Sequence, residues 1–216
     1  ALKGKRVVVF GHDSMGMETA LPHVSATRNQ FGIEITRLDM KLLSDMLAKK
    51  SYDERELLKL KKWIKSDCLK IEIPKETDED NLDKSLALYL IVRDMMKELN
   101  AVGGGFMSQL EWGSDSRGIP LPVADIMESL FNSTFDHNGP KEVIPYATEA
   151  DVQALLTQLF MTWLSGGNPP LFMDFRKVWE PNEIKEFAKQ NKVKLTGKSI
   201  WEKKGFVDGV NSGSAS

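Results

Sequence analysis

The feature that most constrains this sequence is Lys5–Phe10, a run rich in β-branched residues that leads directly into the small-residue segment Gly11–Gly16. Nearly continuous apolar strands are typical of parallel sheets, in which helices cover both faces. A loop of small residues after such a strand is a common passage into a helix. The opening of the chain therefore predicts a buried parallel strand followed by a helix, which is the repeating unit of an α/β fold.

The rest of the sequence alternates between strands and helices. Short β-branched or alternating apolar runs predict strands, and apolar residues at helical spacing predict helices. The expected strands are Phe31–Met40, Ala101–Met107, Val143–Ala147, Pro170–Asp174 and a last one that ends within Gly205–Asn211. The expected helices are Met17–Gln30, which Pro22 interrupts, Asp53–Lys65, Asn81–Asn100, Asp125–Phe131, Ala150–Leu164 and Glu180–Gln190.

Two glycine-containing segments predict different structural features. Gly103–Gly105 lies inside an expected strand, where glycine permits another backbone segment to approach closely. Gly113–Pro122 combines glycine with proline, and this composition predicts an exposed loop near whatever the protein binds. The first segment therefore concerns packing, and the second concerns access to a ligand.

The alternation predicts a single α/β domain over residues 1–216, with a doubly wound, mostly parallel sheet of the Rossmann or flavodoxin-like kind. Crossovers between parallel strands are right-handed and return over the sheet, so helices cover both of its faces. A length of 216 residues also suits one large domain better than two small ones. Such sheets bind ligands outside the carboxyl ends of their strands, and functional residues are expected there.

Composition and charge exclude several classes of protein. Hydrophobic residues make up 41% and charged residues 28% of the chain, which is a globular composition. The net charge of −2 provides no positive field for nucleic acid. Apolar runs such as Leu86–Val92 are far shorter than the roughly 20 residues that span a bilayer. The single cysteine, Cys68, permits neither an internal disulfide nor a cysteine-rich zinc site. We expect a cytoplasmic protein without a nucleic-acid or membrane partner.

Two acidic residues are candidates for a metal site. Thr148 and Asp151 have the spacing of a helix capping box, which places Glu149 at the carboxyl end of an expected strand. Asp174 ends the next expected strand, and neighbouring strands lie roughly 4.8 Å apart. Both carboxylates could then reach one divalent cation, which prefers oxygen ligands. In the alternative interpretation, these acids offset a helix dipole and Asp174 pairs with Arg176.

The remaining polar residues give weaker signals, and each alone is more typical of a surface or core position. The histidines lack the short spacing of a histidine-based metal site, and the cysteine has no histidine beside it. Gly11–Gly16 has the wrong glycine spacing for a dinucleotide or Walker loop, although His12 within it follows the first strand. Gln109 and Ser212 follow expected strands and are candidates to hydrogen-bond with sugar hydroxyls. The other residues considered are His23, His137 and Cys68.

A series of short motifs has a characteristic order and approximate spacing. The motifs are Gly11–Gly16, Leu38–Met40, Tyr52–Glu54, Arg93–Met96, Asn132–Gly139, Ala147–Glu149, Phe172–Asp174, Trp179 and Asn211–Ala215. Taken together they resemble the L-fucose isomerase family. The resemblance covers nearly all 216 residues but only the middle portion of the family's longer chain. The sequence therefore looks like a domain excised from a larger protein.

The resemblance implies an aldose–ketose isomerase that converts L-fucose to L-fuculose and acts also on D-arabinose. The family uses a divalent metal, usually Mn²⁺, in a cytoplasmic homohexamer. Glu149 and Asp174 match its paired carboxylates, which bind the metal and are proposed to move the proton. Gln109 and Ser212 fall at or near positions that contact the sugar, and the third metal ligand, a histidine, lies in a later domain. The isolated fragment is therefore expected to be inactive.

Two other functions remain open at this point. One is a non-catalytic α/β module that binds a sugar or an ion without completing an active site. The other is an isomerase of a different aldose, such as L-arabinose, which would use the same metal chemistry. A panel of sugars distinguishes the second alternative, and restoring the downstream domain distinguishes the first.

Overall fold

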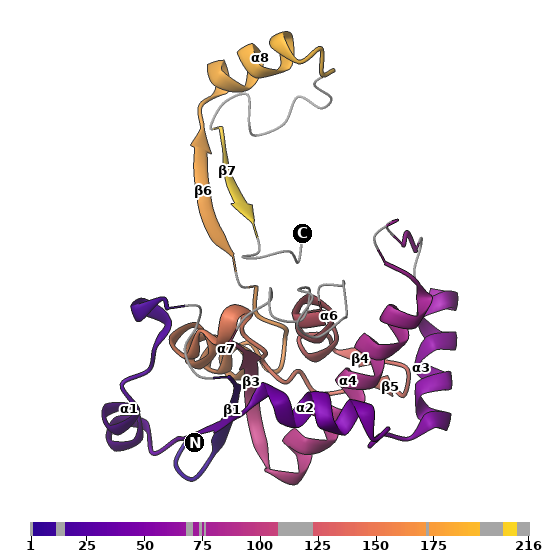
Figure 1. The fold of residues 1–216 in the computed structure, drawn as a ribbon. Helices are drawn as coiled ribbons and strands as arrows, with labels where there is room; N and C mark the ends of the chain where they lie inside the picture. Colours follow the sequence, from indigo (N-terminus) through magenta and orange to yellow (C-terminus); the bar gives the residue numbers. More distant parts are fainter. Residues whose placement is uncertain are drawn as a thin grey trace. The chain divides into compact units, whose positions relative to one another are not determined.

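The computed structural model of the protein describes residues 2–11, 16–67, 71–73, 75, 77–107, 123–171, 173–194 and 205–210 (Figure 1). The chain forms two compact units, of which the first holds the elements from β1 to α7 and the second holds β6, α8 and β7. The elements of the first unit are β1 (Arg6–Phe10), η1 (Glu18–Ala20), α1 (Val24–Phe31), β2 (Glu34–Leu38), α2 (Met40–Ala48), α3 (Glu54–Asp67), α4 (Glu79–Glu98), β3 (Ala101–Phe106), α6 (Val123–Phe131), β4 (Phe135–Asp136), β5 (Gly139–Pro140), η2 (Thr148–Ala150) and α7 (Val152–Leu164). Those of the second are β6 (Asp174–Trp179), α8 (Pro181–Gln190) and β7 (Phe206–Val210).

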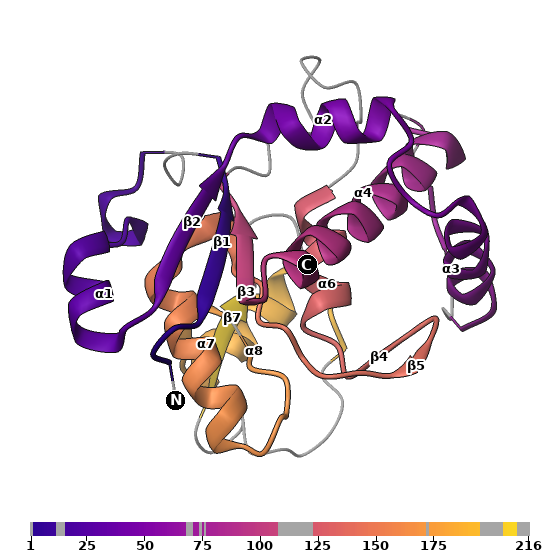
Figure 2. The same ribbon diagram turned by 90° about the horizontal axis from the view of Figure 1, so that it is seen from below.

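A parallel sheet forms the centre of the first unit. Its strands stand in the order β2-β1-β3, and both neighbours pair with β1 in parallel (Figure 2). Val8 of β1 lies opposite Thr36 on one side and Gly104 on the other. Four of the five residues of β1 are buried, as the apolar run predicts for a central strand. Tyr146 adds a single parallel bridge to Gly104, so the predicted strand Val143–Ala147 shrinks to one paired residue.

Helices cover both faces of this sheet, which confirms the predicted α/β class. Val8 and Phe10 point into a core that also holds buried side chains of α2, α4 and α6. Val7 and Val9 point to the opposite face, where they join Ile33 and the buried side of α7. The two cores follow from the period of two in a strand, which sends successive side chains to opposite faces.

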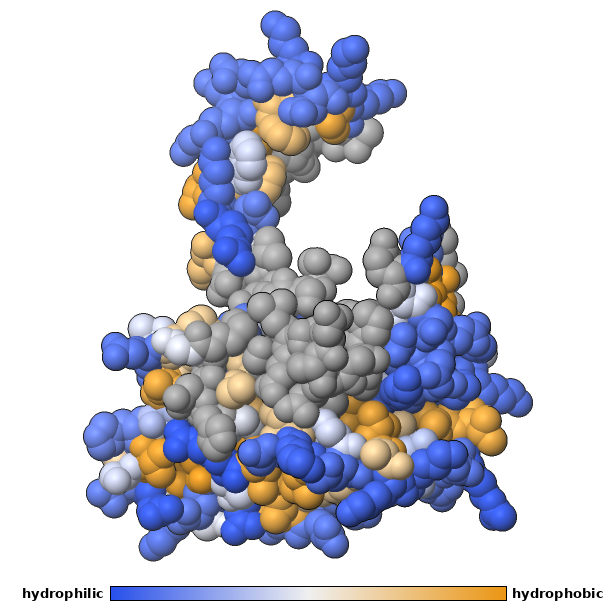
Figure 3. Space-filling view, in the orientation of Figure 1, coloured by the Kyte–Doolittle hydropathy of each residue, from blue (hydrophilic) through white to orange (hydrophobic). Residues whose placement is uncertain are grey.

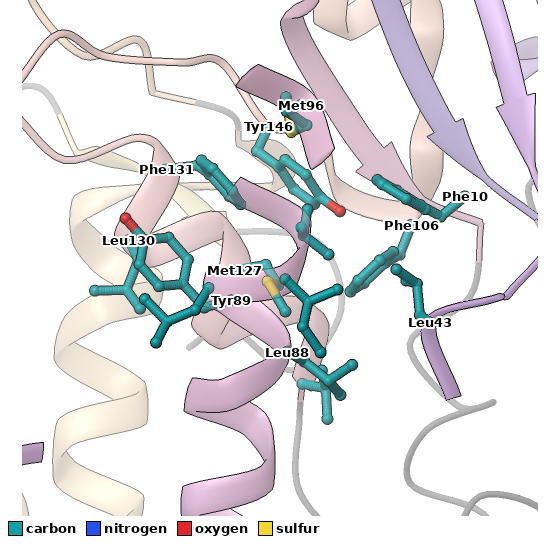
Figure 4. Close-up of a cluster of buried hydrophobic side chains, with 14 of the residues drawn as sticks. Phe10, Leu43, Leu88, Tyr89, Met96, Phe106, Met127, Leu130, Phe131 and Tyr146 are labelled. Atoms are coloured by element: carbon teal, nitrogen blue, oxygen red, sulfur yellow. The ribbon is translucent and has the colours of Figure 1, made fainter. Parts of the chain in front are cut away.

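A chain of aromatic rings links the sheet to α6 and α4 in the first core (Figure 4). Phe10 and Phe106 meet edge to face with their ring centroids 5.3 Å apart, and Phe106 meets Tyr146 in the same way at 5.6 Å. Tyr146 stacks on Phe131 of α6 at 5.0 Å, and Phe131 lies 5.0 Å from Tyr89 of α4. Such pairs add to the free energy gained by burial, so this series fixes α6 against the end of the sheet.

Most of the other predicted elements are confirmed, with two local errors. The expected helix Met17–Gln30 is broken, because Pro22 separates the short η1 from α1, which begins at Val24. His23 is the N-cap of α1 and accepts a hydrogen bond from the Ala26 N–H at 3.2 Å. The sequence pattern does not predict the helix α2, whose first residue, Met40, is the last residue of the expected strand Phe31–Met40.

The second unit differs more from the prediction. The sequence places its strands in a mostly parallel sheet, but β6 and β7 pair with each other in antiparallel fashion. The expected strand Pro170–Asp174 is wrong in its bounds, because β6 begins at Asp174. Proline lacks the N–H that a strand ladder requires, which explains why residues 169 and 170 are not part of it.

Apolar side chains are exposed on the second unit. Phe175, Val178 and Val207 are each more than half exposed, and hydrophobic residues appear among hydrophilic ones on its surface (Figure 3). The aromatic packing of the unit is itself partly exposed: Trp179 packs against Phe206 and Phe187, with ring centroids 6.1 and 5.7 Å apart. A two-stranded ribbon has few contacts of its own, and this one depends on α8 for its packing.

The long helix α4 has 20 residues and is largely buried. It also carries charged residues at both ends, including the N-cap Asp78, which accepts a hydrogen bond from the Asn81 N–H at 2.9 Å. Across the described ranges of the chain, no helix combines the length and the apolar composition that a membrane span requires.

Candidate functional site at the carboxyl edge of the sheet

The three parallel strands end side by side at one edge of the sheet. Phe10 of β1 lies opposite Leu38 of β2 and Phe106 of β3. Ligands of parallel α/β sheets bind beyond such an edge, so the segments that follow these strands define where a site can form. Asp39, which follows β2, accepts a hydrogen bond from the Lys41 N–H at 2.7 Å and caps α2.

The residues Pro145–Ala147 form a fourth chain segment at this edge. Gly104 donates its N–H to the Pro145 carbonyl at 3.0 Å and accepts from the Ala147 N–H at 2.8 Å. A Cβ atom at Gly105 would lie 2.6 Å from the Ala147 carbonyl oxygen and 3.0 Å from the Ala150 Cα. This confirms the prediction that the glycines of β3 permit close approach of another backbone segment.

Glu149 follows this segment in an unusual backbone conformation. Its φ is 55° and its ψ is 24°, and the next residue, Ala150, has a φ of 52°. Residues other than glycine, asparagine and aspartate are uncommon in the left-handed region. The side chain of Glu149 is half-buried, whereas Ala150 is buried. The sequence therefore placed Glu149 correctly at the end of the fourth chain segment, in a conformation that it did not predict.

The predicted capping box around Glu149 is wrong. Asp151 is the N-cap of α7, and its side chain accepts a hydrogen bond from the Ala154 N–H at 2.9 Å. Thr148 instead donates its hydroxyl to Glu128 of α6 at 2.5 Å. The reason is tertiary: Thr148 is only 2% exposed and lies against α6, so its hydroxyl finds a partner there.

Two buried acids of α6 accompany Glu149, and sequence reasoning missed both. Asp125 is 6% and Glu128 is 4% exposed. The pKa of Glu128 is raised to about 8, mainly by burial; the hydrogen bond from Thr148 opposes the shift, and the charges of Asp125 and Glu149 add to it. The available signal was their spacing of three residues, which places them on the same side of a helix that is otherwise largely apolar.

The structure locates the other predicted site residues only in part. Asp174 is the first residue of β6 and pairs with Val210, but its side chain is not among those described. Glu149 and Asp174 belong to different compact units. Gln109, Ser212 and the weaker candidates His12 and Cys68 lie outside the described residues. Their proposed roles therefore stay predictions.

His137 has partners of its own in the first unit. Its side chain is fully buried, and its Nε2 lies 2.9 Å from Glu56 Oε1. Asn138 Nδ2 donates to the same oxygen at 3.0 Å, and Arg93 binds both oxygens of this carboxylate. These contacts join α3 and α4 to the β4–β5 hairpin. Among the described side chains, no three histidines, cysteines or acids converge to hold a metal ion.

The fold and this edge define an α/β protein with a half-buried carboxylate on a left-handed segment, at the position where parallel sheets bind ligands. Residues 5–166, from just before β1 to just past the end of α7, match the domain described as "L-fucose isomerase, second N-terminal domain". The chain belongs to the L-fucose isomerase family.

Named relatives agree with this assignment over the whole chain. The L-fucose isomerase of Clostridium perfringens is 28% identical over 99% of this chain and 39% of its own length. The corresponding values for the L-fucose isomerase of Salmonella choleraesuis are 28%, 100% and 38%. For that of Haemophilus influenzae they are 26%, 100% and 38%. The chain thus spans about two fifths of the length of these relatives.

Proposed function

We propose that this chain supplies part of the active site of an aldose–ketose isomerase that converts L-fucose to L-fuculose and D-arabinose to D-ribulose. Membership of the family supports the class of reaction. The observation that carries the proposal is the placement of Glu149, whose carboxylate follows the fourth chain segment at the ligand-binding edge of the sheet.

Glu149 and Asp174 are the proposed metal ligands, with Mn²⁺ or another divalent cation as the cofactor. Carboxylate oxygens suit a hard cation, and Glu149 carries one pair of them at a half-buried position on the sheet edge. When bound, such an ion would polarise the sugar's carbonyl and stabilise negative charge on its oxygen.

The proposed chemical role of the two carboxylates is proton transfer between C1 and C2 of the sugar. One carboxylate removes the proton from the carbon beside the carbonyl and the other returns a proton to the neighbouring carbon, through an enediol. A hydride shift between the two carbons is the alternative path. Solvent deuterium that appears in the product would favour the enediol.

The remaining parts of the proposal follow from the resemblance to the family. Gln109 and Ser212 would bind hydroxyls of the sugar, which is the small-molecule partner of the site. A histidine from a region that the longer relatives have beyond this chain would be the third ligand. The complete protein would be a cytoplasmic homohexamer.

A chimaera tests the proposal directly. The chain replaces the matching segment of the Clostridium perfringens L-fucose isomerase, and turnover of L-fucose, D-arabinose and L-arabinose is measured with Mn²⁺. We expect turnover of L-fucose that falls at least 100-fold in Glu149→Gln and persists in Glu142→Gln, a matched change at an exposed position.

Other outcomes point to the alternatives. Preference for L-arabinose would identify a different substrate. A folded, assembled chimaera without turnover that still binds Mn²⁺ would favour a binding module, and equal activity in both glutamine variants would remove Glu149 from the site.

A further inference from the structure

Glu128 is a buried carboxyl that the proposed reaction does not use. It lies on α6, is 4% exposed, and accepts the Thr148 hydroxyl at 2.5 Å. Thr148 is 2% exposed and immediately precedes Glu149. The bond joins residues 20 positions apart, so it ties the segment that carries Glu149 to a separate helix.

A second contact is made by Asn132, the residue that directly follows α6. Asn132 donates its side-chain amide to the Tyr146 carbonyl at 3.0 Å and accepts from the Tyr146 N–H at 3.0 Å. These two bonds fix Tyr146, and the Thr148 hydroxyl contacts α6 directly before Glu149. Glu128 therefore restrains the position of Thr148.

The backbone at Glu149 and Ala150 needs restraint on both sides. Two successive non-glycine residues are left-handed there, and such conformations persist only where the surrounding structure holds them. On the far side, Asp151 caps α7 through the Ala154 N–H. On the near side, the bond between Thr148 and Glu128 is a side-chain restraint.

The second oxygen of Glu128 supports a role beyond ordinary packing. Glu128 Oε1 is buried and has no hydrogen-bond partner among the described residues. Buried polar atoms without partners are rare and destabilise the fold. Burial also raises the pKa of this carboxyl, so the proton it retains near neutral pH avoids a second negative charge close to Glu149.

We propose that Glu128 is a positioning residue for Glu149: it holds Thr148 in the interior and thereby fixes the left-handed backbone that presents the Glu149 carboxylate at the sheet edge. Glu128 acts through Thr148 and is not itself a ligand. The inference rests on the proposed function, because that function gives the Glu149 carboxylate its metal.

Matched variants of the full 216-residue chain separate the hydrogen bond from the bulk of the side chains. Thr148→Val and Glu128→Leu remove the bond, whereas Thr148→Ser and Glu128→Gln retain a donor and an acceptor. Thr162→Val is the control, because Thr162 is also buried and its hydroxyl bonds to the Gln158 carbonyl within α7.

Two readouts are measured on each variant. The first is the intraresidue nuclear Overhauser effect between the amide proton and Hα of Glu149, which is strong when φ is positive. The second is Mn²⁺ affinity by calorimetry. We expect Thr148→Val and Glu128→Leu to weaken the Overhauser effect and lower Mn²⁺ affinity at least tenfold. The double variant should show the same losses as each single variant, because all three remove the same hydrogen bond. Thr148→Ser, Glu128→Gln and Thr162→Val should keep both values.

Several results would overturn the positioning role. One is a folded Thr148→Val variant in which the Overhauser effect at Glu149 stays strong. Another is a Glu128→Gln variant that loses as much of the Overhauser effect and of Mn²⁺ affinity as Glu128→Leu does. If the disruptive variants do not fold, the wild-type chain decides: a Thr148 hydroxyl proton that exchanges freely with water contradicts the proposal. Failure of the proposed function gives a different result. Glu149→Gln would then leave Mn²⁺ affinity unchanged, while the Overhauser effect at Glu149 would still test whether Glu128 fixes the backbone.

Discussion

Arg93 of α4 binds both carboxylate oxygens of Glu56 on α3, with a distance of 2.8 Å between Nη2 and Oε2. The two side chains are 21% and 23% exposed. The pKa of Glu56 is lowered to about 2, mainly by the hydrogen bonds from Arg93; burial opposes the shift, and hydrogen bonds from His137 and Asn138 add to it. One carboxylate therefore holds together two helices and the β4–β5 hairpin.

Glu56→Gln should destabilise the first unit by about 1–3 kcal/mol, because it leaves the partly buried Arg93 without its counter-charge. Urea unfolding at pH 7 measures the change in free energy. Glu54→Gln on the same helix is the control, since Glu54 is 66% exposed and its ion pair with Lys50, at 3.3 Å, lies on the surface. That variant should differ from wild type by less than about 0.5 kcal/mol. Equal effects in the two variants would contradict the role of Glu56.

The same ion pair predicts the response to acid. The pKa of Glu56 is lower in the folded state than its ordinary value of 4.5, so its contribution is complete above pH 4.5. That contribution is lost as the pH falls towards about 2. Between these values the stability gap between wild type and Glu56→Gln should narrow, which unfolding curves at successive pH values will measure. A constant gap would show that the carboxylate's charge does not matter.

Glu128 predicts the opposite dependence at higher pH. Its pKa is raised from 4.5 to about 8, so the folded chain keeps a proton that the unfolded chain has already lost. The contribution of Glu128 to the free energy of unfolding is complete below pH 4.5 and is lost as the pH rises to about 8. Glu128→Gln should remove this decline, which amounts to at most about 5 kcal/mol at 1.36 kcal/mol for each unit. Unfolding from pH 5 to 9 in the presence of EDTA provides the measurement, with Glu142→Gln as an exposed control.

Gly105→Ala tests the close approach that creates the candidate site. The added Cβ would press on backbone atoms of Ala147 and Ala150, so the segment that carries Glu149 must shift. We expect a loss of about 1–3 kcal/mol in unfolding free energy and displaced amide resonances at residues 147–150. Ala101→Val enlarges the far end of the same strand and should leave those resonances in place. Unchanged resonances in Gly105→Ala would contradict the close contact.

The elements that the sequence predicted well have strong local signals. Val7–Phe10 is apolar throughout, and Glu79–Glu98 has a long helical pattern with an acidic N-cap, so local chemistry and tertiary packing agree. Met40–Ala48 was missed because it follows β2 after a single residue, and apolar periodicity does not separate elements joined so closely.

The sequence predicts the position of a site residue only where that position follows from the order of strands and helices along the chain. Glu149 follows the fourth chain segment and could be located in this way. The partner of Thr148 could not, because a hydroxyl at the start of a helix normally caps that helix, and only packing against α6 redirects it to Glu128. The bounds of β6 were wrong for a related reason: its pairing with β7 depends on residues more than 25 positions away.

The backbone of Glu149 leads to a final prediction that separates stability from function. Glycine adopts a positive φ without steric cost, so Glu149→Gly should relieve strain of about 1 kcal/mol. It also removes the carboxylate, and Mn²⁺ affinity should fall at least tenfold while the melting temperature holds or rises. Gln153→Gly is the control, because this exposed position within α7 should lose roughly 0.5–1 kcal/mol and keep Mn²⁺ affinity. A melting temperature that falls equally in both variants would contradict this prediction. It would show that the left-handed conformation at Glu149 stores no strain and does not reduce the stability of the protein.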